Sequence, residues 1–185
     1  AERLIELENL KDETLSYEKL PENLYDRMQE IVFENVKFSY SSDSVVSGIN
    51  MRIKKGECAV VAGESGAGKS TSLKLLLGIM SPDSGRIYMK YDGGEIELGK
   101  DTRELFAYVP QGNLILSGTI RENIAFAKDS ASEEDIIKAA KIAQIWDFIS
   151  SLEDGLDTHL GEKGLGISEG QTQRISIARA ILLDA

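Results

Sequence analysis

An eight-residue run rich in glycine is the stretch of this sequence best suited to chemistry. Residues 63–70 read Gly-Glu-Ser-Gly-Ala-Gly-Lys-Ser and match the phosphate-binding pattern G-x-x-x-x-G-K-[ST]. Glycines let successive backbone N–H groups curl around a phosphate, and the N-terminus of the following helix adds partial positive charge. The Lys69 ammonium would reach the β- and γ-phosphates of a nucleoside triphosphate, and the Ser70 hydroxyl would bind Mg²⁺.

The pattern therefore predicts a triphosphate site, with an ordinary glycine turn as the competing interpretation. The residues predicted to contact the nucleotide through this loop are Gly63, Ser65, Gly66, Ala67, Gly68, Lys69, Ser70 and Thr71.

A second glycine-containing stretch, residues 161–174, leads into another predicted helix. Ser168 stands three positions before Gln171, which is the spacing of a capping box. The helix that follows is predicted to bury one side, made of Ile175, Ala178, Ile181 and Leu182. A capped helix N-terminus can bind an anion, although on local chemistry alone a plain helix cap is the more common interpretation.

A strand and a helix must position the first loop. The apolar run 58–62 lies between Gly56 and Gly63 and is typical of a strand buried on both faces. Residues 69–77 are predicted as a helix with Leu73, Leu76 and Leu77 on its buried side. The order strand, glycine loop, helix is the one that phosphate binding requires.

The rest of the chain predicts an α/β fold. An antiparallel β layer is expected from Ile31 to about Val109, including a hairpin around 91–94 and a last strand at 105–109. A helical subdomain is expected at about 113–166, where Ser132 and Asp135 form a predicted capping box. Residues 1–30 read as a linker with a short charged helix at 3–10, and residues 31–185 as one domain.

Charge and composition exclude some classes of function. The formal net charge of −10 disfavours nucleic-acid binding, which needs clustered Lys and Arg. We find neither a membrane-spanning apolar stretch nor a signal sequence, and expect the chain itself to be soluble. The single cysteine, Cys58, is predicted to be a packed thiol, and His159 a surface loop residue.

Together the two glycine motifs resemble the ATP-binding cassette (ABC) family, because 161–174 is similar to its signature sequence. The resemblance implies ATP and Mg²⁺ as cofactors, and nucleotide contacts from Ser168, Gly170 and Gln171. It also implies that Tyr40 stacks on adenine. Gln111 looks like the Q-loop glutamine, which in the family contacts Mg²⁺ and the attacking water. Lys69 and Gln111 are thus the expected catalytic residues, and Ser70 and Gln111 the expected metal ligands.

Residues 119–124 and 161–164 are similar to exporter-type domains. The resemblance therefore implies the ATP-hydrolysing motor domain of a membrane exporter, lying at the cytoplasmic face of the plasma membrane. Its expected partners are a second nucleotide-binding domain, bound head to tail, and the transmembrane domain of the same transporter. A non-hydrolysing ATP-sensing module and a soluble ABC ATPase are the two alternatives.

The sequence departs from the family in two ways. Glu169 stands where the family usually has glycine, so a carboxylate would lie near the bound triphosphate. We also expect the Walker B strand, the catalytic glutamate and the switch histidine to lie beyond Ala185. The 185 residues alone are therefore expected to lack ATP turnover.

Overall fold

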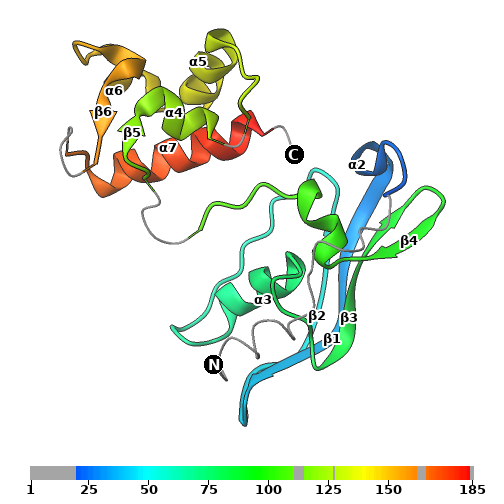
Figure 1. The fold of residues 1–185 in the computed structure, drawn as a ribbon. Coiled ribbons are helices and arrows are strands. Elements are labelled where there is room, and N and C mark those ends of the chain that lie inside the picture. Colours follow the sequence, from blue (N-terminus) through cyan, green and yellow to red (C-terminus); the bar gives the residue numbers. More distant parts are fainter. Residues whose placement is uncertain (1–19, 111–114, 127, 162–165, 184–185) are drawn as a thin grey trace, which may run out of the picture. The chain divides into compact units, whose positions relative to one another are not determined.

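The structure is a computed structural model that describes residues 20–110, 115–126, 128–161 and 166–183 (Figure 1). The chain divides into two units, Ala1–Leu105 and Phe106–Ala185. The predicted helix at 3–10 and the residue Gln111 lie outside the described residues.

The first unit is built on an antiparallel sheet. Its elements are α2 (Leu24–Arg27), β1 (Met28–Tyr40), β2 (Asp43–Lys54), α3 (Lys69–Leu76), β3 (Ser84–Tyr91), β4 (Gly94–Glu97) and the 3-10 helix η2 (Lys100–Leu105). The strands lie in the order β2-β1-β3-β4, and every neighbouring pair is antiparallel. The hairpin predicted around 91–94 is therefore confirmed between β3 and β4.

The long central strand β1 carries the core of this unit. Ile31 and Phe33 point to one face and Val32 to the other, and all three are buried. Asn35 has a left-handed backbone with φ of 48°, and the pairing of β1 with β2 shifts register between Phe33 and Val36. This bulge keeps Val36 fully buried beyond the kink.

Charged side chains from three strands lie on the same face of the sheet as Val32. Arg86 on β3 donates hydrogen bonds to Glu34 on β1 and Glu95 on β4, with N–O distances of 2.7 and 2.5 Å. The Arg86 guanidinium also lies 4.1 Å from the centroid of the Tyr88 ring, which is itself buried. Exposed pairs of this kind add little stability but shield the apolar centre of the sheet from water.

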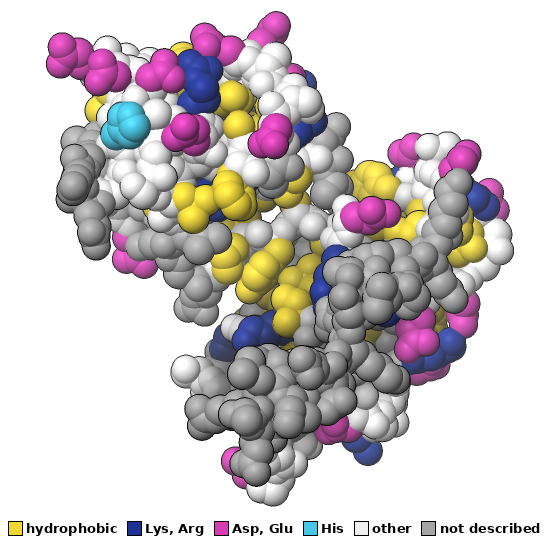
Figure 2. All heavy atoms as spheres, viewed as in Figure 1, with side chains coloured by type: hydrophobic (Ala, Val, Ile, Leu, Met, Phe, Trp, Pro, Cys, Tyr) yellow, Lys and Arg dark blue, Asp and Glu magenta, His cyan; other side chains and the backbone are white. Residues whose placement is uncertain are grey.

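The second unit is mainly helical. Its elements are β5 (Gly118–Thr119), α4 (Ile120–Ala125), α5 (Glu133–Ile142), α6 (Trp146–Ser150), η3 (Gly155–Asp157), β6 (His159–Leu160) and α7 (Glu169–Leu182). Its hydrophobic core includes Ile120, Ile124, Ile149 and Ile175, none of which is exposed to solvent. Figure 2 shows acidic side chains spread over this unit, with His159, which lies on β6 rather than in a loop, exposed at the surface.

Capping boxes fix where three of these helices begin. Ser132 and Asp135 form the predicted box at α5, and Ser168 and Gln171 form the predicted box at α7. In each, the serine hydroxyl accepts from the backbone N–H three residues on, which satisfies a donor that a helix start leaves open. Thr119 and Glu122 form a third box at α4 that our sequence analysis overlooked, although its T-x-x-E spacing signals it.

The predicted strand at 58–62 was wrong. These residues carry no strand, Cys58 is exposed, and Val60 is 85% exposed. Among the described residues no strand pairs with this run, and an apolar extended segment gains its hydrogen bonds only from neighbouring strands. The prediction of a strand at 105–109 was wrong in the same way, since η2 ends at Leu105 and residues 106–109 are not in a strand.

The helix after the glycine loop was predicted correctly in place but not in its buried face. α3 buries Thr71, Ser72 and Leu75, and Leu77 just beyond it is also buried, whereas Leu73 is 43% exposed. α3 contacts β2, and leucine spacing alone did not reveal which side of the helix is buried. Among the described residues, no helix combines the length and apolar character needed to cross a bilayer.

Candidate functional site

The glycine loop leads directly into the N-terminus of α3. Gly66 and Gly68 have positive φ angles of 87° and 82°, which residues with a Cβ rarely adopt. Gly68 is the N-cap residue of α3 and offers no side chain to satisfy the first N–H groups of the helix. Unlike α5 and α7, α3 therefore begins with backbone donors that an anion can take.

Lys69 folds back over this loop. Its ammonium donates to the carbonyl oxygens of Gly63 at 2.8 Å and Glu64 at 2.5 Å. The backbone N–H of Ala67 donates to Glu64 at 3.2 Å and closes the turn. The Lys69 ammonium is thus held against the backbone of the glycine loop. A phosphate is negatively charged and would bind this ammonium more strongly than the two neutral carbonyls do.

The loop has room for a ligand. A Cβ built on Gly66 would meet no atom within 4 Å, so this stretch of backbone faces open space. Ser65, Ala67 and Ser70 are exposed, and the Ser70 hydroxyl is accessible to an ion. Thr71 is 8% exposed and lies on the packed side of α3. These residues fit a triphosphate with Mg²⁺: backbone donors, one ammonium and one exposed hydroxyl.

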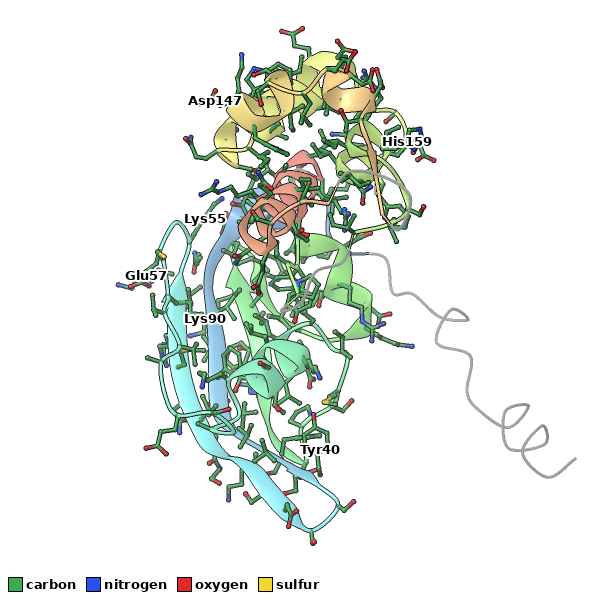
Figure 3. The ribbon with its side chains drawn as sticks, turned by 90° about the vertical axis from the view of Figure 1, so that its left-hand side faces the viewer. Tyr40, Lys55, Glu57, Lys90, Asp147 and His159 are labelled. Atoms are coloured by element: carbon green, nitrogen blue, oxygen red, sulfur yellow. The ribbon has the colours of Figure 1, made fainter. Side chains whose placement is uncertain are left out.

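Tyr40 ends β1 on the side of the sheet where α3 lies (Figure 3). Its hydroxyl lies 3.3 Å from the sulfur of Met80, which follows α3 in the chain. Its ring makes an edge contact with Phe38 at 4.9 Å, and the residue is 43% exposed. A partly exposed ring steadied on two sides can offer a flat apolar surface to a base.

The signature stretch belongs to the second unit. The Ser168 Oγ accepts from the Gln171 N–H at 3.2 Å, and the Gln171 Oε1 accepts from the Ser168 N–H at 2.8 Å. A hydroxyl that accepts still carries its own proton to donate. Ser168, Glu169 and Gly170 are exposed, so the first turn of α7 presents polar groups to solvent.

The predicted site residues thus fall into two groups. Those of the glycine loop lie with Tyr40 in the first unit, and Ser168, Gly170 and Gln171 lie in the second. Within the part of the chain that the structure describes, no three side chains of His, Cys, Asp or Glu cluster as metal ligands.

Comparison with known proteins gives the family. The sequence model of the ABC transporter family matches residues 46–185, well over half of the 185-residue chain. The chain belongs to the ABC transporter family. It is an ATP-binding domain related to those of exporters, with the mixed α/β fold of ABC ATPases.

Two curated relatives are named for translocation and for lipid flipping. The chain is 42% identical over 157 residues to the leukotoxin translocation ATP-binding protein LktB of Mannheimia glucosida, covering 83% of the chain and 22% of that protein. It is 42% identical over 159 residues to the ATP-dependent lipid A-core flippase of Desulfotalea psychrophila, covering 85% of the chain and 27% of the flippase. The chain thus spans about a quarter of the length of these relatives.

A solved structure supports the same family. The chain resembles a bacterial Atm1-family ABC exporter with ATP bound, with a TM-score of 0.78 and 34% identity over 97% of the chain and 32% of the exporter chain. An identity of this size relates the sequences as well as the folds. The predicted α/β ABC fold is therefore confirmed.

Inside the helical unit of this ABC domain, the sequence analysis missed one polar group. Asn123 on α4 is 1% exposed, and its helix neighbours Ile120 and Ile124 belong to the apolar core of the unit. The ion pairs of Arg121 were not predicted either. Arg121 binds Asp157 through Nε at 2.8 Å and Glu133 at 2.9 Å, and so connects α4 to η3 and α5. The hydrogen bond from Arg121 holds the pKa of Asp157 below its ordinary value.

Proposed function

We propose that the chain is the ATP-binding and ATP-hydrolysing motor domain of a membrane ABC exporter. The observation that carries this is the Lys69 ammonium held at the rim of the glycine loop, where α3 begins without a side-chain cap. Family membership and the similarity to a translocation protein, a flippase and an exporter structure support it.

The nucleotide contacts follow from the residues in place. Backbone N–H groups of 63–71 bind the phosphates, and Lys69 leaves its two carbonyl partners to neutralise the β- and γ-phosphates. Ser70 and Gln111 hold Mg²⁺, which when bound offsets the charge that develops on the transferred phosphoryl group. Tyr40 stacks on adenine and so sets the position of the base.

Completion of the site requires a second domain. We infer a head-to-tail dimer in which Ser168, Gly170 and Gln171 of one chain close over the triphosphate bound by the glycine loop of the other. The exposed first turn of α7, with a hydroxyl proton available on Ser168, supports this role. In the whole protein, association and release of the two nucleotide-binding domains would drive a transmembrane domain. The chain would lie at the cytoplasmic face of the plasma membrane, and its partner would be that transmembrane domain rather than nucleic acid.

Calorimetric titration with Mg-ATP tests the nucleotide site. Lys69→Ala should weaken binding tenfold or more, which corresponds to about 1.4 kcal/mol. Lys74→Ala is the matched control, because Lys74 lies on the same helix one turn beyond the loop and should leave affinity unchanged. Equal affinity of Lys69→Ala and the wild type would remove the basis of the proposal.

We further propose that the 185 residues alone bind ATP without turning it over. Hydrolysis needs a group that orients or deprotonates the attacking water, and the family's catalytic glutamate follows an apolar strand that this sequence does not contain. Phosphate release should be absent from the 185-residue chain and should appear when the chain is extended through that strand. Equal, Lys69-dependent release from both would place the role on Glu64, Glu162 or Glu169. No release from either would favour an ATP-sensing module.

A further inference from the structure

The buried Asn123 uses every hydrogen-bonding position of its side-chain amide. Its Oδ1 accepts from the Leu116 N–H at 2.9 Å and from Arg179 Nη2 at 3.3 Å. Its Nδ2 donates to the carbonyl oxygens of Leu116 at 2.9 Å and Thr119 at 3.0 Å. An amide has two donors and two acceptor positions, so burial leaves none of them without a partner.

Two of these bonds imitate a strand. The Asn123 amide receives the N–H and donates to the C=O of the same residue, Leu116, as a residue on a neighbouring antiparallel strand would. Leu116 lies just ahead of β5, which pairs with β6. The side chain therefore continues the pairing of this extended segment where the backbone ladder has stopped.

The other bonds connect the same residue to α7. Arg179 Nε donates to the Asn123 carbonyl at 2.7 Å, and Nη2 donates to Oδ1, so the guanidinium fork grips Asn123 at two points. Arg179 lies 56 positions along the chain from Asn123 and is partly buried. Burial lowers the pKa of Arg179, but a guanidinium stays charged at neutral pH, so the fork stays intact.

We propose that Asn123 and Arg179 act as one positioning unit that sets helix α7 against the segment 115–119. The bonds meet at one oxygen, Asn123 Oδ1, which serves both Leu116 and Arg179. A change at Arg179 must therefore reach Leu116, although no bond joins these two residues in the structure as described. Groups that share a buried network depend on one another more than separate pairs do.

The consequence for the nucleotide site rests on the proposed function. Ser168 begins α7, about 16 Å along the helix from Arg179 at 1.5 Å per residue. Because a helix is rigid, a tilt of α7 at Arg179 also displaces its first turn. Asn123 and Arg179 are thus positioning residues for the signature turn, and they contact no nucleotide themselves.

Spin-label distances and amide exchange on the 185-residue chain test the unit in the absence of nucleotide. Labels replace Glu134 on α5 and Glu169 on α7, both exposed, in a Cys58→Ser background. Asn123→Ala and Arg179→Lys should each broaden the distance distribution, and Arg179→Lys should speed exchange of the Leu116 amide at least fivefold. Arg174→Lys is the control, because Arg174 is exposed on the same helix and should change neither readout.

Emission of Trp146, which packs against the core of this unit, checks that each variant remains folded. Unchanged Leu116 exchange in a folded Arg179→Lys variant overturns the proposal. If Arg179→Lys does not fold, Asn123→Asp replaces it. The carboxylate can still accept from Leu116 and Arg179, but its second oxygen faces the carbonyl oxygens of Leu116 and Thr119 and repels the segment that carries them. That variant should speed Leu116 exchange, and unchanged exchange in the folded Asn123→Asp variant would overturn the proposal. None of these results depends on whether Lys69 binds ATP.

Discussion

Gly68 and Gly66 provide a matched pair of substitutions in the glycine loop. Both have positive φ angles, 82° and 87°, so alanine at either position meets the same backbone strain, about 1–2 kcal/mol. Their surroundings differ. A Cβ on Gly68 would lie 2.7 Å from the Val45 carbonyl oxygen and 3.3 Å from Val46 Cγ2, whereas a Cβ on Gly66 meets nothing within 4 Å.

The difference between the two variants isolates the packing of α3 on β2. The obstructing oxygen belongs to the backbone of β2, so relief requires either the helix start or this part of β2 to move. Overpacking of this kind costs about 1–3 kcal/mol. Gly68→Ala should therefore destabilise the first unit by about 2–5 kcal/mol and Gly66→Ala by about 1–2 kcal/mol.

Thermal unfolding without nucleotide measures this difference. Far-UV circular dichroism follows the whole chain, while emission of the single tryptophan, Trp146, reports the second unit separately. For a unit of this size, 1 kcal/mol corresponds to about 4–8 °C, so Gly68→Ala should melt at least about 4 °C below Gly66→Ala. Equal melting temperatures would show that α3 is not pressed against Val45 as the structure describes, and the reasoning would fail.

Two further predictions concern the base contact and acid stability. Tyr40→Ala should weaken Mg-ATP binding by the lost stacking contribution, roughly 0.5–1.5 kcal/mol, whereas Tyr40→Phe should bind as the wild type does. Equal titration curves for the two variants would show that Tyr40 does not stack on the base. Arg121 lowers the pKa of Asp157, and Ser132 lowers that of Asp135. Both carboxylates therefore stabilise the folded state fully above the ordinary carboxylate pKa of about 4, and this stabilisation is lost as the pH falls through their pKa values in the folded state. The melting temperature of the second unit, followed by Trp146 emission, should therefore fall below about pH 4, less steeply in Asp157→Asn, and an identical slope would count against the Arg121 pair.

Short sequence patterns predicted the elements whose stabilising contacts are made between residues close in sequence. The predicted start of the β layer at Ile31 falls within β1, and serine followed three residues on by Asp or Gln located the starts of α5 and α7. The family followed from the glycine loop and the signature stretch, because their residues carry chemistry that few other spacings provide.

Features that depend on distant partners were not predictable. The run 58–62 has strand-like residues but no strand beside it among the described residues, and its thiol is consequently exposed. Asn123 and Arg179 are 56 positions apart, and no spacing rule joins an asparagine on one helix to an arginine on another. The roles of Gln111 and Ser168 stay predictions, the former outside the described residues.

Amide chemical shifts recorded during titration with Mg-ATP test the central claim most directly. The account predicts saturable changes that are largest at residues 63–71, accompanied by a ring shift at Tyr40 and abolished by Lys69→Ala. The exposed surface of α5, far in sequence from the loop, should not respond. Shifts centred on the second unit, or a response at 63–71 that survives Lys69→Ala, would contradict the assignment of this loop as the ATP site.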